Sequence, residues 1–145
     1  MPQIDFYLLD QQVADGRLRV TCRLCKKIHA LGHTIFVQIP DLEQARILDD
    51  LMWTFDQSAF IPHGLHDSRG SGTGFPVTIG QLPPPNSGFN VLISLLDEVP
   101  EHYDQYPRVV ELVDNTPQDK ARARDRYRVY RDKGCTLETH QINVY

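Results

Sequence analysis

The sequence predicts an α/β fold: a three-layer, Rossmann-like domain in which helices flank a mostly parallel central sheet. Short apolar runs alternate with segments of helical periodicity along the first half of the chain. A later run, residues 90–95 (NVLISL), is almost continuously apolar, as expected for a strand covered on both faces of a sheet. At 145 residues the chain has the length of one domain, so we expect a single domain over residues 1–145.

The first half of the chain has the order strand, helix, strand, helix. Residues 4–9 (IDFYLL) and 34–39 (TIFVQI) predict two strands. Between them, apolar residues recur at helical spacing from Val20 to Leu31, and a glycine ends that helix. Asp41 is the predicted N-cap of a second helix with an apolar inner side. This order is typical of a βαβ unit with a right-handed crossover.

The second half of the chain supplies the remaining strands. Residues 76–80 (PVTIG) predict one strand, residues 90–95 the next, and residues 110–113 the end of a third. Residues 83–88 (PPPNSG) are a connector, because proline and glycine interrupt regular structure. Residues 136–142 are expected to form an edge strand.

The last predicted helix carries a concentration of positive charge. Thr116 is its expected N-cap, Pro117 occupies the first helical position, and Gly134 follows its end. Seven of the 15 Lys and Arg residues lie within residues 120–133, whereas the whole chain has net charge −4. Basic residues gathered at one place on an acidic protein indicate an acidic ligand bound there, and they argue against diffuse coating of DNA.

The basic residues of this helix are not distributed evenly around it. At about 100° per residue, one face carries a basic and aromatic stripe: Lys120, Arg124, Tyr127 and Arg131. Arg128 lies on the flank of this face, and Ala123 and Tyr130 are predicted to point to the core. Alternatively, the helix is simply exposed to solvent, and the Arg side chains in its last turn are favoured there by the helix macrodipole. The aromatic ring of Tyr127 within the stripe favours a binding face.

Composition excludes several classes of protein. The 41% hydrophobic and 23% charged residues are typical of a soluble globular chain. No apolar run approaches the length of a bilayer, and the N-terminus has no basic region before a hydrophobic stretch, so we expect neither membrane insertion nor secretion. The chain has three cysteines, which cannot all pair with one another and are too few for a disulfide framework. This sparseness suits a reducing compartment, so we expect a cytoplasmic protein.

A nucleotide cofactor is not expected. Gly70, Gly72 and Gly74 match neither G-x-G-x-x-G nor a phosphate loop with a trailing Lys-Ser/Thr. No strand directly precedes them and no helix follows, so a flexible loop is the better interpretation. The first strand is followed by residues 10–12 (DQQ) instead of glycines, which removes the usual dinucleotide site.

A metal or redox centre is not expected either. Cys22, Cys25 and His29 all fall inside the first predicted helix. A closed zinc site needs four ligands, and the remaining candidates, Cys135 and His140, are distant in sequence. A redox pair would lie at a helix N-terminus, where the thiolate is stabilised. Half-buried structural cysteines are the prediction.

The residues around position 60 allow more than one interpretation. His63, His66 and Asp67 suggest acid–base chemistry, but no nucleophile accompanies them, so polar surface is the prediction. Trp53 ends the second predicted helix close to Phe60. A single tryptophan there is either a core residue or an exposed anchor for a partner, and the sequence leaves both open.

Along nearly its whole length, the sequence resembles the chi subunit of bacterial DNA polymerase III holoenzyme. The segments that carry the resemblance are FYLL at 6–9, Leu48 to Trp53, FIPH at 60–63, PV at 76–77, LISL at 92–95 and, in the last helix, AR at 121–122, RYR at 126–128 and YR at 130–131, followed by Gly134. No single segment is diagnostic, but their order and spacing together are specific. The resemblance implies the same α/β fold.

The resemblance also implies a function. Chi subunits have no catalytic activity of their own within the DNA-directed DNA polymerase, a nucleotidyltransferase complex. They link the clamp-loader complex, through a small partner called psi, to single-stranded DNA-binding protein (SSB). They hold the acidic C-terminal tail of SSB, which ends in an aromatic residue and a free carboxylate. No cofactor and no metal are implied.

The resemblance transfers two sets of binding residues to this chain. The implied SSB-tail site comprises Lys120, Arg124, Tyr127 and Arg128, with Val113 lining the pocket and Trp53 flanking it. The implied psi contact comprises Phe60, Ile61 and Pro62. In such a tail site, the cations would pair with the carboxylates of the tail through charge-assisted hydrogen bonds.

Two other functions remain as alternatives. The same basic helix could bind single-stranded nucleic acid directly, with Tyr127 and Tyr130 stacking on bases. The negative charge of the rest of the chain opposes a long strand, so strong direct DNA binding is not expected. A small nucleotide-dependent enzyme rests on fold analogy alone. Whether a repair helicase competes with psi or SSB for these surfaces stays open.

Overall fold

A computed structural model describes residues 2–56, 60–66, 75–82 and 88–145. The strands within these residues are β1 (Gln3–Leu9), β2 (Ile35–Gln38), β3 (His63–His66), β4 (Val77–Gly80), β5 (Val91–Ser94), β6 (Arg108–Val113) and β7 (Thr136–Ile142). They form one sheet in the order β3-β4-β2-β5-β6-β1-β7. Every pairing in it is parallel, so the mostly parallel sheet expected from the sequence is confirmed.

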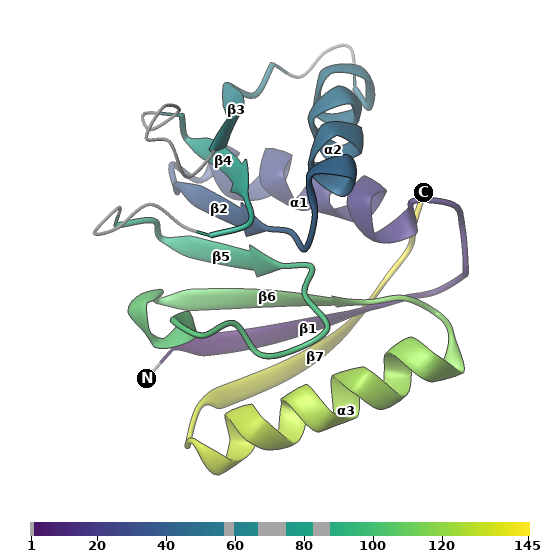
Figure 1. The fold of residues 1–145 in the computed structure, drawn as a ribbon, viewed down its shortest axis with the longest axis vertical. Helices are drawn as coiled ribbons and strands as arrows, with labels where there is room; N and C mark the ends of the chain where they lie inside the picture. Colours follow the sequence, from purple (N-terminus) through teal and green to yellow (C-terminus); the bar gives the residue numbers. More distant parts are fainter. Residues whose placement is uncertain (1, 57–59, 67–74, 83–87) are drawn as a thin grey trace.

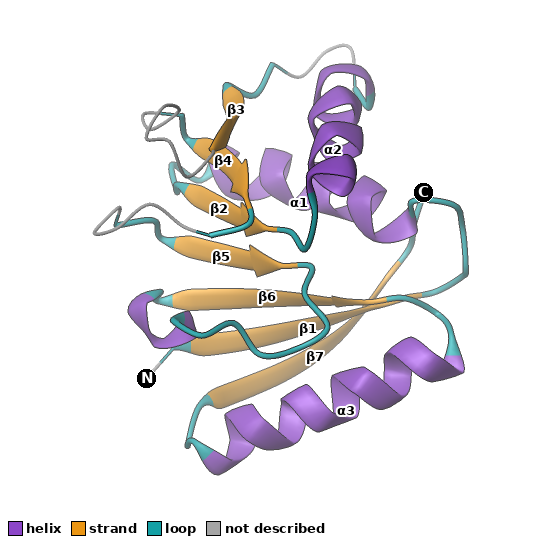
Figure 2. Cartoon of the chain, viewed as in Figure 1, coloured by secondary structure: helices purple, strands orange, loops and turns teal. Residues whose placement is uncertain are grey.

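Helices cover both faces of this sheet. They are α1 (Gly16–Ala30), α2 (Leu42–Thr54) and α3 (Pro117–Asp132), and a short 3₁₀ turn covers Tyr103–Gln105. Helices α1 and α2 pack on one face and α3 packs on the other, which is the predicted three-layer arrangement (Figures 1 and 2). In the described part of the chain, no helix is both long enough and apolar enough to cross a membrane.

Each face of the sheet has its own hydrophobic core. The core under α1 and α2 contains Cys22 and Cys25, which are completely buried instead of half-buried as expected. Burial raises the pKa of the Cys22 thiol to about 12 and also raises that of Cys25. Such surroundings disfavour the reactive thiolate, in agreement with a structural role. The second core lies between α3 and the sheet and contains Phe6 and Tyr130.

Strand β3 was missed by the sequence analysis. Its sequence, HGLH, lies between a proline and an aspartate and has no clear alternation. His63, expected at the polar surface, is 5% exposed, because it lies under the ring of Trp53 and beside Asp49. The Gly70 to Gly74 loop, Asp67 and most of the 83–88 connector lie outside the described residues.

Candidate functional site

The N-terminus of α3 is held in place by its own cap. The Thr116 hydroxyl accepts a hydrogen bond from the Asp119 backbone N–H at 3.2 Å, as predicted for an N-cap. The buried Asp119 carboxylate in turn accepts a hydrogen bond from the backbone N–H of Asp114, at 2.7 Å. These contacts connect α3 to the end of β6, so the first turn of the helix has a defined position beside the sheet.

A buried polar network holds the middle of α3. Glu111 on β6 is completely buried and accepts hydrogen bonds from Arg126 Nε at 3.1 Å and from the Tyr130 hydroxyl at 2.6 Å. Arg126 Nη1 also donates to the carbonyl oxygen of Asp97, at 3.0 Å. Because Arg126 and Tyr130 must both face Glu111, the network fixes the rotation of α3 about its axis. That rotation decides which basic residues face outward.

The network predicts a pH-dependent contribution to stability. Burial raises the pKa of Glu111 from 4.5 to about 7, although Arg126 and Tyr130 favour the charged form. The folded protein therefore binds more protons than the unfolded chain between these pH values, and the free energy of unfolding falls as pH rises through this window. Relative to a Glu111→Gln variant, the wild type should lose about 3 kcal/mol of stability from pH 4.5 to 7. Urea unfolding at several pH values measures this difference, and parallel pH profiles for the two proteins would contradict it.

A groove lies between α3 and the sheet strands next to it. Its volume is about 230 Å³, and it is lined by Phe6, Leu8, Val113, Lys120, Ala123, Arg124, Tyr127 and Thr139. Phe6 and Leu8 project from β1 and Val113 from β6, so the floor is apolar. Tyr127 is 36% exposed, and the centroid of its ring lies 5.6 Å from that of Phe6. The groove therefore has one wall formed by a partly exposed aromatic ring.

The cations at the groove differ from the other basic residues of α3. Elsewhere on the helix, acidic partners already pair with the guanidinium groups: Arg122 with Asp97, Arg126 with Glu111, Arg128 with Asp125, and Arg131 with Asp132. Within the described residues, no ion pair or side-chain hydrogen bond joins Lys120 or Arg124 to another residue. Both side chains are exposed at the rim of the apolar groove. The groove can therefore accept a ligand with an apolar group and an adjacent negative charge.

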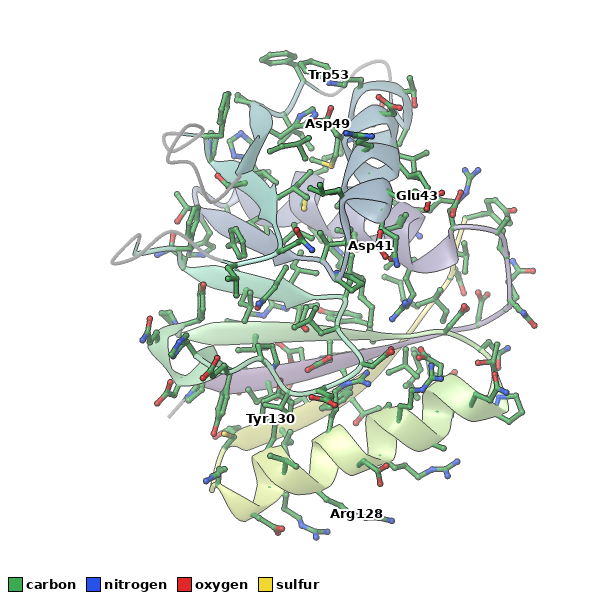
Figure 3. All side chains as sticks on the ribbon, in the orientation of Figure 1. Asp41, Glu43, Asp49, Trp53, Arg128 and Tyr130 are labelled. Carbon is green, nitrogen blue, oxygen red and sulfur yellow. The ribbon has the colours of Figure 1, made fainter. Side chains whose placement is uncertain are left out.

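The structure brings together four of the six residues predicted for the tail site. Val113, Lys120, Arg124 and Tyr127 line the groove as a group. Arg128 is not among the lining residues: it points to the outer side of α3 and donates to Asp125 at 3.1 Å (Figure 3). The helical spacing already placed Arg128 on the flank, and its pairing with Asp125, three residues before it, keeps it there.

The expected position of Trp53 beside the groove is wrong. Trp53 lies at the end of α2, on the opposite side of the sheet from α3, and Figure 3 shows it far from Arg128 and Tyr130. Its ring contacts Phe60 and His63 at centroid distances of 5.9 and 4.4 Å. The right-handed crossovers place α2 and α3 on opposite faces, and this separation cannot be read from residue types alone.

Four lining residues were not predicted as part of the groove. Phe6 and Leu8 alternate along β1 and so share one sheet face, a signal that the sequence IDFYLL contains. Ala123 was expected to point to the core, which it does, and its small side chain also borders the groove. Thr139 belongs to the edge strand β7, which lies next to β1 only in the folded sheet. No local pattern identifies it.

The residues predicted for the psi contact form part of a second surface. Phe60 is 71% exposed and Trp53 is 53% exposed, and their rings are in contact. Pro62 is half-buried, but Ile61 is 3% exposed and belongs to the core, so its side chain does not contribute to this surface. Phe75 is 41% exposed, but its ring lies against Gly64 of β3, so it faces the opposite side of the strand from His63 and Trp53. We call Trp53 and Phe60 the aromatic surface.

One group of side chains has the composition of a cation site. In the part of the chain that the structure describes, Asp5, Glu138 and His140 are the three candidate ligands that lie within 4.8 Å of one another. Burial alone would raise the pKa of Asp5, but hydrogen bonds from His140 and Arg108 outweigh it and lower the pKa. The Arg108 guanidinium, 2.7 Å from Asp5, already neutralises this carboxylate. The group therefore fits an ion-pair network joining β1, β6 and β7 better than a metal centre.

The fold and the groove together define a parallel α/β domain with a cation-rimmed binding groove beside its last helix. Comparison with known proteins identifies the family. The model of the family described as DNA polymerase III chi subunit, HolC, matches residues 1–138. The chain belongs to the DNA polymerase III chi subunit family.

Curated relatives share this family name. The DNA polymerase III subunit chi of Pseudomonas aeruginosa is 34% identical over 142 residues, which cover 98% of each chain. The subunit chi of Escherichia coli is 31% identical over 144 residues, covering 96% of this chain and 97% of that protein. The subunit chi of Haemophilus influenzae is 26% identical over 140 residues, covering 94% and 95%.

Solved structures show where else this fold occurs. T4 UvsW superimposes with a TM-score of 0.66 at 10% identity, over 99% of this chain and 42% of that one. The C-terminal domain of Saccharomyces cerevisiae Dbp5 has a TM-score of 0.62 at 8% identity, over 96% and 89%. At these identities the likeness concerns the fold alone.

Proposed function

We propose that this protein is a non-catalytic adaptor of DNA polymerase III whose α3 groove binds the acidic C-terminal tail of SSB. The observation that carries the proposal is the pairing of an apolar groove with two rim cations, Lys120 and Arg124, that have no acidic partner in the described residues. A solvated helix would not need an apolar groove beside these cations. An aromatic side chain with a free carboxylate has the chemistry that matches both features.

The groove suggests how such a tail would be bound. The terminal aromatic ring would lie on Val113 and Phe6 and against Tyr127, with its apolar area removed from water. The terminal carboxylate would accept hydrogen bonds from Arg124 and Lys120. Because these cations are exposed, their attraction for an acidic tail increases the rate of association, and added salt weakens that attraction. A single short tail buries little area, so we expect micromolar affinity, raised by the multivalency of SSB.

Titration with a synthetic SSB tail peptide tests this function. We expect binding that weakens with added salt, because the rim cations are exposed. Binding should be lost when the last residue of the peptide is removed. That truncation deletes the aromatic ring and moves the free carboxylate to the preceding residue. Fluorescence anisotropy of the labelled peptide measures both effects. No binding of the intact peptide at low salt would refute the proposal.

We further propose that the aromatic surface binds psi and so links the protein to the clamp-loader complex. Exposed aromatic rings in contact with each other are typical of the energetic centre of a protein interface. Phe60 and Trp53 lie on the α2 side of the sheet, away from the α3 groove. The two partners would therefore bind at the same time, as an adaptor requires.

Replacing Phe60 by Asp should abolish binding to psi by this protein. Phe60 is 71% exposed, so the change removes a large ring from the interface with little effect on folding. Co-purification with the psi protein of the same organism measures the interaction. Leu31→Asp is the matched control, because Leu31 is 70% exposed but lies at the end of α1. Equal loss in both variants, or normal binding by Phe60→Asp, would contradict the assignment.

A further inference from the structure

A second concentration of positive charge lies on α1, on the opposite side of the sheet from the α3 groove (Figure 1). Helix α1 contains five basic residues and no acidic residue: Arg17, Arg19, Arg23, Lys26 and Lys27. Together, α1 and residues 120–133 hold twelve of the 15 Lys and Arg residues of the chain. The proposed tail site uses none of the five on α1.

The exposed basic residues of α1 form a row. Arg19, Arg23 and Lys27 are exposed and separated by four residues, so they follow one another along one face at intervals of about 6 Å. Lys26 is exposed beside this row. A regular row of cations matches a ligand with a regularly repeated negative charge, which the phosphate backbone of a nucleic acid has.

A groove continues from this row. It has a volume of about 500 Å³, and its lining includes Arg23, Lys26, Lys27, Phe55 and Asp56. The half-buried ring of Phe55, which follows α2, forms part of its wall. A ring beside a row of cations is the combination by which proteins bind single strands, because any base can stack on the ring while the cations follow the phosphates.

Contacts within the chain hold two of these basic side chains beside the groove. Lys26 forms an ion pair with Asp56, and Arg23 donates a hydrogen bond to the carbonyl oxygen of Asn143 in the C-terminal segment. Arg19 donates a hydrogen bond to the carbonyl oxygen of Ala14 at 3.4 Å, and no acidic side chain among the described residues pairs with its charge. The face therefore keeps most of its positive charge for a ligand.

We propose that the α1 face is a binding surface for the phosphate backbone of a short stretch of single-stranded nucleic acid. The net charge of −4 does not prevent this, because charges more than about 10 Å away are largely screened at 0.1 M salt. The surface is short, so it contacts about three phosphates and binds weakly and without sequence preference. The proposal does not depend on the tail site, which lies on the other sheet face.

Fluorescence anisotropy of a short labelled oligothymidylate tests the proposal. The wild type should bind with a slope of log K against log salt of about −2, which corresponds to three phosphates. The double variant Arg19→Glu/Lys27→Glu should bind at least about tenfold more weakly and with a slope reduced by about 1.4. This variant leaves the Lys26–Asp56 pair and the Arg23 hydrogen bond in place. Should it unfold, Arg19→Gln/Lys27→Gln replaces it.

The matched control is Arg124→Glu, which reverses one charge on α3. It should bind the oligonucleotide as the wild type does, whereas the α1 double variant should bind the SSB tail peptide normally. The proposal is overturned if the wild type does not bind at low salt, or if the double variant binds the oligonucleotide unchanged. Loss of oligonucleotide binding in Arg124→Glu alone would place the nucleic-acid surface on α3. Binding of a polyglutamate peptide without the oligonucleotide would assign the α1 face to an acidic protein.

Discussion

Arg124→Glu is expected to abolish binding of the SSB tail peptide while leaving the thermal unfolding of the protein unchanged. Arg124 lies at the rim of the α3 groove without an acidic partner in the described residues, so its loss leaves the fold intact. A hydrogen bond to a charged group contributes about 2 kcal/mol, and the new carboxylate also repels the tail. The lost hydrogen bond alone should lower the affinity by about thirtyfold, and the repulsion lowers it further, so binding of a micromolar ligand should no longer be detected. Peptide anisotropy measures the affinity and calorimetry the unfolding.

Arg122→Glu is the matched control for this variant. It makes the same charge change on the same helix, but Arg122 lies outside the groove and only 3.8 Å from Asp97 in an exposed pair. We expect the peptide affinity to change by only a few-fold, through the general charge of the helix. Arg128→Glu should behave in the same way, because Arg128 pairs with Asp125 on the outer side. Loss of binding in all three variants would mean that net charge, and not the groove, controls the interaction.

Arg126→Met should be among the most destabilising changes on the surface between α3 and the sheet. It removes the ion-pair partner of Glu111, which is completely buried, and within the described residues only the side-chain hydrogen bond from Tyr130 still reaches the carboxylate. Breaking a buried pair in this way costs about 3–5 kcal/mol, a large share of the stability of a small domain. Urea unfolding at pH 8 measures the loss. The loss should be smaller at pH 5, where protonation neutralises Glu111.

A double variant separates the buried charge from the lost packing. Arg126→Met combined with Glu111→Gln leaves no charge in the core, and the amide oxygen of Gln can still accept from Tyr130. Most of the stability lost in Arg126→Met should therefore return. If the double variant is no more stable than the single one, the uncompensated charge is not the cause.

Local sequence patterns predicted most of the elements. The N-cap at Thr116, the first-turn proline and the positive φ of Gly134 define both ends of α3, and all three act through neighbouring residues. Strand β3 lacks such a pattern, because its burial comes from contact with α2 and pairing with β4. The same contact explains why His63 is in the core although its sequence neighbours are polar.

For the candidate groove, the sequence determined the charge and the face of the helix. The spacing of Lys120, Arg124 and Tyr127 sets a common side wherever α3 packs, because helical geometry is local. Only the tertiary structure decided which cations lack partners and what lies beneath them. Asp97 pairs with Arg122 and Glu111 pairs with Arg126, although the members of each pair are far apart in the sequence. The apolar floor of the groove comes from two separate strands. Pairing and burial depend on which distant segments meet, and the parallel sheet with its crossovers sets that arrangement.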